Sequence, residues 1–243
     1  MNSTAVITLE RVWGTETSPY NTASIRPFID GIKAFSDSFD FYYSHFYGRE
    51  SLREALNEFL NPCYRRIILQ IAGHGSGKKI ASTQFGTVFE TIASVQKEKK
   101  FNGSIGLIMS SCLMGSNKEL ISQGIRQARL QWFFGYNCAS LWMESTLIDT
   151  FLLYFLTKKG IHVQPTQDYL IRCFRDALAL FDKNYLIGSD DASEKSIKEG
   201  LTLMISDGDF RRKPIDASSL LLDRKSTRLN SSHSRRSRMP SSA

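Results

Sequence analysis

The sequence predicts an α/β fold in which a mostly parallel sheet lies between two layers of helices. Apolar runs typical of strands alternate five times with segments whose apolar residues repeat at helical spacing. Two of the runs, 65–73 and 104–112, are almost continuously apolar, as in strands that a parallel sheet buries on both faces. These observations indicate a doubly wound, three-layer sandwich.

The chain is expected to form two strands and two helices before residue 65. Residues 5–13 and 39–47 are rich in β-branched and aromatic side chains, which favour strands. Residues 25–35 have the apolar spacing of a helix between them. Ser51–Glu54 matches a capping box, so we expect a helix that begins at the serine and continues to Leu60.

The alternation of helices and strands continues after the strand at 65–73. Helical spacing predicts helices around 85–92, 120–128, 141–156 and 170–181, and Asn117 is expected to cap the second of these. Residues 104–112 and 130–137 are expected to form strands. Beyond Gly188 the signals weaken, and one domain over 1–222 is the simplest organisation.

The basic charge of the chain lies mostly in its last segment. The net charge is +7, and residues 223–243 hold six Lys/Arg and one Asp, so the rest of the chain carries only +2. This Ser/Arg-rich segment is expected to be a disordered basic tail. Its sequence resembles translated adapter or vector DNA, and we interpret it as an artefact. A basic arm for nucleic acid is the alternative; otherwise no direct nucleic-acid binding is expected.

Composition and cysteine spacing narrow the class of protein further. No secretory signal precedes the first expected strand, and the apolar stretch 141–156 is too short to span a membrane. The four cysteines have no regular spacing, which predicts neither a disulfide framework nor a zinc site. We therefore expect a cytoplasmic protein that does not bind membranes.

Residues 72–79, Ala-Gly-His-Gly-Ser-Gly-Lys-Lys, resemble a phosphate-binding loop at first sight. Aligned on Gly77 and Lys78, however, Ala72 stands in place of the first glycine of that motif. Lys79 replaces the Ser/Thr whose hydroxyl holds magnesium. A P-loop-like nucleotide hydrolase is therefore only a remote alternative.

The same stretch supplies half of a possible catalytic dyad. His74 follows one central strand and Cys112 ends the next, so both are expected at the carboxyl edge of the sheet. A cysteine nucleophile needs a nearby base, because its unperturbed pKa of about 8.5 leaves little thiolate at neutral pH. Gly75 allows close approach of a substrate carbonyl, to which its N–H could donate.

Two segments extend this pattern into a resemblance to a known family. Residues 67–76, "IILQIAGHGS", and 105–116, "IGLIMSSCLMGS", resemble the caspase-like (clan CD) cysteine peptidases, most closely the bacterial CHAT domain family. Residues 132–160 are similar to the strand, turn and long helix that follow the cysteine in CHAT domains. The resemblance covers roughly 5–185 and implies a caspase-like three-layer sandwich.

The resemblance also implies residue roles. His74 would be general base and acid, and Cys112 the nucleophile that forms a thioester. The backbone N–H groups of Gly75 and Cys112 would form the oxyanion hole. The protein would be a cysteine endopeptidase without metal or organic cofactor. It would act on a protein or peptide substrate under control of a regulatory protein partner, in a stress or antiphage-type pathway.

Departures from the family pattern leave substrate preference open. The animal-caspase signature Gln-Ala-Cys is Ser110-Ser111-Cys112 here, and Ser111 replaces the Asp that often precedes the cysteine in metacaspases. Glu16 and Glu144, which follow the first and fifth expected strands, are candidates for binding a basic P1 residue, although solvated surface glutamates are the plainer interpretation. A catalytically silent caspase-like binding scaffold is the second hypothesis.

Overall fold

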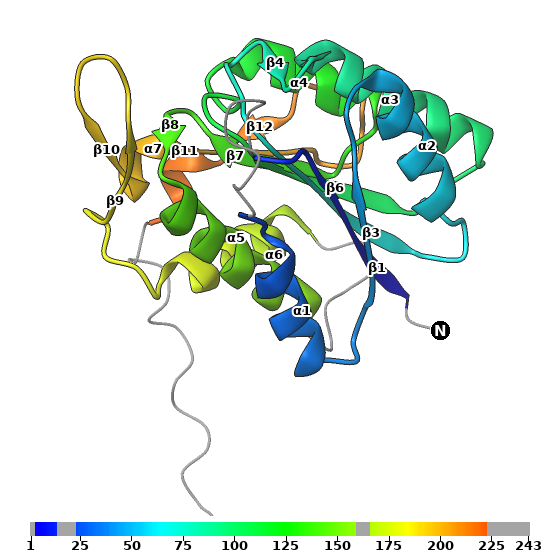
Figure 1. Ribbon diagram of the computed structural model, residues 1–243, viewed down its shortest axis with the longest axis horizontal. Coiled ribbons are helices and arrows are strands. Elements are labelled where there is room, and N and C mark those ends of the chain that lie inside the picture. Colours follow the sequence, from blue (N-terminus) through cyan, green and yellow to red (C-terminus); the bar gives the residue numbers. More distant parts are fainter. Residues whose placement is uncertain (1–2, 14–22, 159–165, 223–243) are drawn as a thin grey trace, which may run out of the picture.

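A seven-stranded sheet forms the centre of the computed structural model, which describes residues 3–13, 23–158 and 166–222 (Figure 1). The strand order is β12-β11-β7-β6-β3-β1-β2. The strands are β1 (Thr4–Glu10), β2 (Asp40–His45), β3 (Arg66–Ala72), β6 (Ser104–Ser110), β7 (Trp132–Tyr136), β11 (Leu201–Ile205) and β12 (Ile215–Asp216). β2, β1, β3, β6 and β7 run parallel, and β11 is antiparallel to both of its neighbours, β7 and β12. The predicted tail, 223–243, and Glu16 lie outside the described residues.

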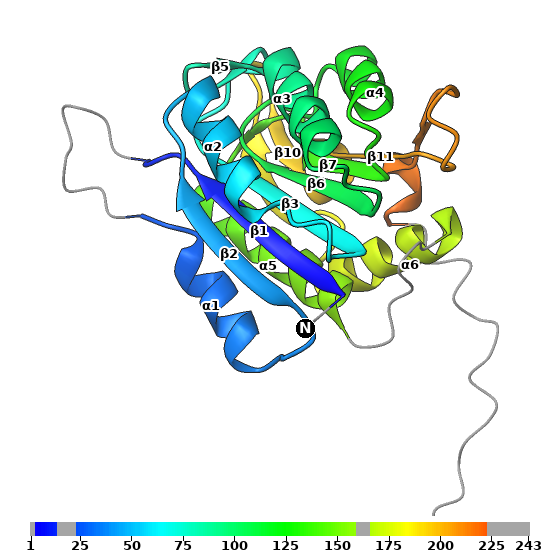
Figure 2. The same ribbon diagram turned by 90° about the vertical axis from the view of Figure 1, so that its right-hand side faces the viewer.

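Helices cover both faces of the sheet, as predicted (Figures 1 and 2). One face carries α2 (Arg49–Phe59), α3 (Phe85–Glu98) and α4 (Lys118–Gln127), and the other carries α1 (Arg26–Ala34), α5 (Trp142–Thr157) and α6 (Gln167–Leu178). Alternate residues of β3 enter opposite cores: Ile67 and Leu69 belong to one apolar cluster and Ile68 to the other. The three-layer α/β sandwich is confirmed, with a mostly parallel sheet.

Short elements complete the fold after the central strands. β4 (Lys79–Ile80) pairs with β5 (Thr83–Gln84), and β8 (Ala139–Ser140), β9 (Leu186–Ser189) and β10 (Glu194–Ser196) form a second small sheet. The last elements are α7 (Ile197–Gly200) and a 3-10 helix, η1 (Ser218–Leu220). No helix in the described part of the chain is long and apolar enough to cross a membrane.

The start of α2 differs from the prediction. The helix begins at Arg49, so Ser51 is its third residue and not its N-cap. The Ser51 hydroxyl accepts hydrogen bonds from the N–H groups of Tyr47 and Gly48, at 2.8 and 3.1 Å. The serine thus stabilises the helix start from within the first turn. The predicted cap at Asn117 is confirmed, since its side chain accepts from Leu120 N at 3.0 Å.

A buried acid lies beneath the carboxyl edge of the sheet. Asp149, on α5, is 2% exposed, and its Oδ1 accepts a hydrogen bond from the Tyr136 hydroxyl at 2.8 Å. Burial raises the pKa of Asp149 to about 7, an effect that hydrogen bonds from Ser110, Tyr136 and Gln70 reduce. The folded protein therefore binds a proton here that the unfolded chain, with an aspartate pKa of about 3.9, releases.

This shift predicts that Asp149→Asn stabilises the protein at alkaline pH. Because the folded-state pKa is raised, wild-type stability falls as pH rises from about 4 through 7, by up to about 4 kcal/mol. Urea unfolding at pH 5 and pH 8 should show that the free energy of unfolding of the variant does not decrease in this way. The exposed control Asp191→Asn should keep the decrease. Equal destabilisation by Asp149→Asn at both pH values would contradict the prediction.

Candidate active site

The His74 loop leaves the sheet at the carboxyl end of β3. Arg11 N donates to Ala72 O at 2.8 Å, which continues the β1–β3 pairing by one residue. A Cβ at Gly73 would lie 2.8 Å from Arg11 Cβ, so only glycine allows this approach. The loop then turns back on itself, and Ala81 N donates to His74 O at 2.9 Å. These bonds fix where His74 leaves the sheet.

The His74 imidazole is held by Trp13, which follows β1. His74 Nε2 lies 3.1 Å from Trp13 O, and the two rings pack edge to face with centroids 5.2 Å apart. A carbonyl oxygen only accepts, so Nε2 carries the hydrogen of this bond. In the neutral ring, Nδ1 is then the free basic nitrogen. His74 is exposed, so this nitrogen is open to a substrate.

Cys112 lies in a tight turn that begins directly after β6. The Ser111 hydroxyl donates to Gly73 O at 2.6 Å, which joins the two loops of the candidate site. Leu113 has a φ of 62°, in the left-handed region, and its N–H donates to Cys138 O at 2.9 Å. The half-buried cysteine is therefore fixed on both sides by backbone contacts.

The structure brings the predicted oxyanion donors together. A Cβ at Gly75 would lie 2.5 Å from Cys112 O, so the two backbones are in van der Waals contact. Within the described residues, the N–H groups of Gly75 and Cys112 donate to no other group. Unpaired backbone N–H groups close to a nucleophile are the kind of donors that bind a developing oxyanion.

The Cys112 sulfur does not contact His74 in this structure. Sγ lies 3.7 Å from both the carbonyl oxygen and the hydroxyl of Ser140, on β8. One torsion, χ1, sets the position of a cysteine sulfur, and it has three staggered values. Pairing with His74 would require at least a rotation of this side chain away from Ser140.

We predict that Gly75→Ala impairs both stability and reactivity. The added methyl group would overlap Cys112 O, and overpacking of this kind costs about 1–3 kcal/mol. Thermal unfolding and the rate of Cys112 alkylation measure the two effects. The control is Gly31→Ala on α1, where a Cβ meets no atom within 4 Å; it should leave the rate unchanged and raise stability by about 1 kcal/mol. Wild-type alkylation in Gly75→Ala would contradict the prediction.

The other sequence candidates lie away from this contact or outside the described residues. Glu144 is half-buried in the first turn of α5 and forms no ion pair within the described part of the chain, and its proposed role at P1 stays a prediction. Lys78 and Lys79 are exposed, and α3 begins only at Phe85. A phosphate-binding loop needs a helix immediately after its lysine, so the structure does not support the hypothesis of a nucleotide hydrolase.

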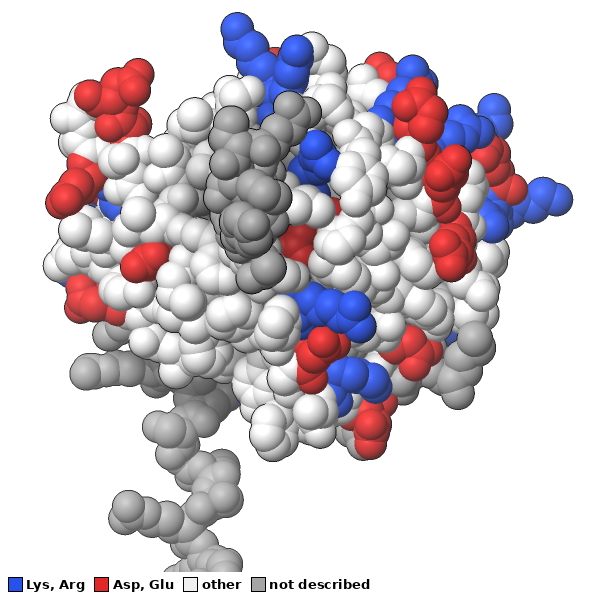
Figure 3. All heavy atoms as spheres, in the orientation of Figure 1, with Lys and Arg blue, Asp and Glu red and all other residues white. Residues whose placement is uncertain are grey.

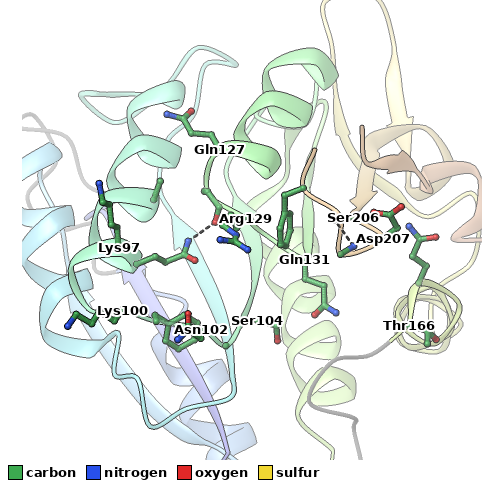
Figure 4. A pocket seen from close by; sticks show the side chains of 18 residues that line it. Lys97, Lys100, Asn102, Ser104, Gln127, Arg129, Gln131, Thr166, Ser206 and Asp207 are labelled. Atoms are coloured by element: carbon green, nitrogen blue, oxygen red, sulfur yellow. Dashed lines mark hydrogen bonds between the residues drawn. The ribbon is translucent and has the colours of Figure 1, made fainter. Parts of the chain in front are cut away.

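Neither the surface charge nor the cavity found in the structure identifies a ligand for the candidate site. Acidic side chains gather on the β9–β10 hairpin, whereas both signs are mixed over the helices (Figure 3). A cavity of about 900 Å³ lies at the amino ends of β6 and β7, away from the dyad (Figure 4). Lys97, Lys100 and Arg129 line it, but no histidine or cysteine does. Among the described residues no group of three or more His, Cys, Asp or Glu is placed to hold a metal ion.

Sequence reasoning missed Trp13 and Ser140 as parts of the site. Both follow strands of the same sheet edge, β1 and β7, so the rule that placed His74 and Cys112 there could have found them. Neither carries a side chain typical of a dyad. Trp13 acts on His74 through its carbonyl and ring, and Ser140 contacts the sulfur.

Comparison with known proteins bears on the fold. No family model matches the chain, and neither does any curated protein sequence. Among solved structures, caspase-1 from Spodoptera frugiperda is similar, with a TM-score of 0.51 and 11% sequence identity over 83% of this chain and 86% of that chain. This similarity does not single out the CHAT family, which stays a prediction. The seven-stranded, mostly parallel sheet with helices on both faces is a caspase-like fold.

Proposed function

We propose that the protein is a cysteine endopeptidase with a His74–Cys112 dyad. The observation that carries the proposal is the contact between the His74 and Cys112 loops at one edge of a caspase-like sheet. The N–H groups of Gly75 and Cys112, which belong to these two loops, are unpaired within the described residues. Nucleophile, base and oxyanion donors are the parts that acyl transfer by a thiol needs.

In the proposed mechanism, His74 Nδ1 takes the thiol proton as Cys112 Sγ attacks the scissile carbonyl carbon. The N–H groups of Gly75 and Cys112 bind the resulting oxyanion. When the C–N bond breaks, the imidazolium returns the proton to the leaving amine and a thioester remains. Water, deprotonated by His74, then hydrolyses the thioester. Such general acid–base catalysis contributes about 10²–10⁴ to the rate.

For the substrate, the partner and the compartment, the proposal keeps the expectations from the sequence. We propose a protein or peptide substrate, a regulatory protein partner and a reducing, cytoplasmic compartment, as in bacterial CHAT domains. The neighbourhood of Ser140 supports a peptide substrate, because a scissile carbonyl that reaches Cys112 also reaches the β8 backbone. Its polar groups are suited to pairing with an extended peptide.

The test is cleavage of a proteome-derived peptide library under reducing conditions, with the new termini mapped by mass spectrometry. We expect internal cuts that disappear after treatment with iodoacetamide. The same assay with host-cell lysate added tests for the regulatory partner. Cuts that survive alkylation would contradict a thiol mechanism.

One observation favours the alternative, a catalytically silent scaffold: the Cys112 sulfur faces Ser140 and not His74. The two hypotheses differ in the order in which cysteines react. All four cysteines are free, and Cys63 is exposed whereas Cys112 is half-buried. A dyad predicts that iodoacetamide labels Cys112 before Cys63 at pH 6, where an ordinary thiol is mostly protonated. A scaffold predicts the reverse order.

A further inference from the structure

The carboxylate of Glu10 is buried next to the residue that holds His74. Glu10 ends β1 and is 1% exposed. Its Oε1 accepts hydrogen bonds from the Trp13 indole Nε1 at 2.6 Å and from the Ile25 N–H at 2.9 Å. A buried carboxylate persists only when its oxygens are paired in this way. One oxygen of Glu10 therefore fixes the Trp13 side chain.

The other oxygen is fixed by two hydroxyls. Glu10 Oε2 accepts from Ser24 Oγ and from Tyr43 OH, both at 2.6 Å. Burial, followed by the hydrogen bond to Glu10, raises the pKa of Tyr43 to about 12, so this hydroxyl remains a donor at neutral pH. His45 Nε2 lies 2.9 Å from the same hydroxyl. Four donors from three segments thus fix the carboxylate in one position.

Trp13 connects the fixed Glu10 carboxylate to the His74 imidazole. Its carbonyl and its ring both contact His74, at 3.1 Å and at a centroid distance of 5.2 Å. On its other side the indole packs edge to face against Trp142, at 6.4 Å between centroids. The group that orients His74 is therefore itself oriented by Glu10. In the described part of the structure, His74 has no other side-chain hydrogen bond.

We propose that Glu10 is a positioning residue of the catalytic site, which acts through Trp13 to hold His74 with Nδ1 free for Cys112. The inference rests on the proposed function. The proposal predicts different effects for glutamine and for leucine at position 10. Glutamine keeps an oxygen for Trp13 and Ile25, and its NH2 group can donate to the hydroxyls of Ser24 and Tyr43. Leucine has similar bulk but no acceptor.

The test measures the rate of Cys112 alkylation by iodoacetamide between pH 5 and 9. In Glu10→Leu we expect the rate at pH 6.5 to fall about 10- to 100-fold and the profile to approach that of an ordinary thiol. Glu10→Gln should restore the wild-type profile. Trp13→Phe keeps the carbonyl and an aromatic ring but loses the indole N–H, and it should resemble Glu10→Leu. Trp13→Phe still tests the proposal if Glu10→Leu does not fold.

A buried core variant separates positioning from general destabilisation. Leu56→Ala, on α2, should lower stability and leave the profile unchanged. A wild-type profile in Trp13→Phe, or equal losses in Glu10→Gln and Glu10→Leu, would overturn the inference while the dyad stands. If His74→Ala leaves the wild-type profile unchanged, the proposed function itself fails.

Discussion

Replacing Cys112 with alanine is expected to abolish peptide cleavage and leave the fold intact. The sulfur is the only atom of the proposed site that forms a bond to the substrate, so no residual route through a thioester remains. Alanine removes one half-buried atom that makes two long contacts, both 3.7 Å to Ser140. We therefore expect a melting temperature close to that of the wild type.

The matched controls are the other cysteines. Cys63→Ala removes an exposed thiol and Cys173→Ala a half-buried one on α6, and both variants should cleave at the wild-type rate. Cleavage is measured on the peptide that the library assay identifies, in the presence of a reducing agent. Activity in Cys112→Ala above about 1% of wild type would contradict the proposed nucleophile, since a thioester cannot form without this sulfur.

The second large effect is expected from His74→Ala. The general base then disappears while Cys112 and both N–H donors remain, so the rate should fall by about 10²–10⁴ and not to zero. The fold should persist, because His74 is exposed and its imidazole makes one hydrogen bond, to Trp13 O. Peptide turnover at saturating substrate measures the loss.

Chemical rescue sharpens this prediction. Because the vacated site is open to solvent, imidazole in the buffer should restore part of the rate in His74→Ala. It should restore nothing in Cys112→Ala. Asp191→Ala is the control for loss of an exposed polar side chain, since Asp191 lies between β9 and β10 and takes no part in the contacts described for His74 or Glu10. A full wild-type rate in His74→Ala would contradict its role as base.

The central fold, and the position of His74 and Cys112 at one edge of its sheet, could be predicted from the sequence because both depend on patterns local to each strand. The runs that became β3 and β6 are apolar throughout, and parallel strands bring their carboxyl ends to one edge. That geometry alone places His74 and Cys112 near each other. Helix α2 begins two residues before the predicted start, because Ser51 accepts from the N–H groups of Tyr47 and Gly48 from within the first turn, whereas the sequence motif predicts an N-cap.

The features that the sequence did not predict depend mainly on contacts between segments that are distant along the chain. Glu10 looks like an ordinary charged residue at a strand end, and its burial becomes possible only through donors at residues 13 to 43. The direction of the Cys112 sulfur depends on Ser140, 28 positions away. β11 was missed although Leu201–Ile205 is apolar, because no helical segment follows it to mark a strand–helix unit.

The pH dependence of Cys112 alkylation, in the wild type and in His74→Ala, tests the dyad most directly. It needs neither the substrate nor a partner protein. The dyad predicts fast, selective labelling of Cys112 at pH 6, where an ordinary thiol is mostly protonated, and slow, unselective labelling at that pH in His74→Ala. Identical profiles in the two proteins, or equal labelling of all four cysteines, would contradict it.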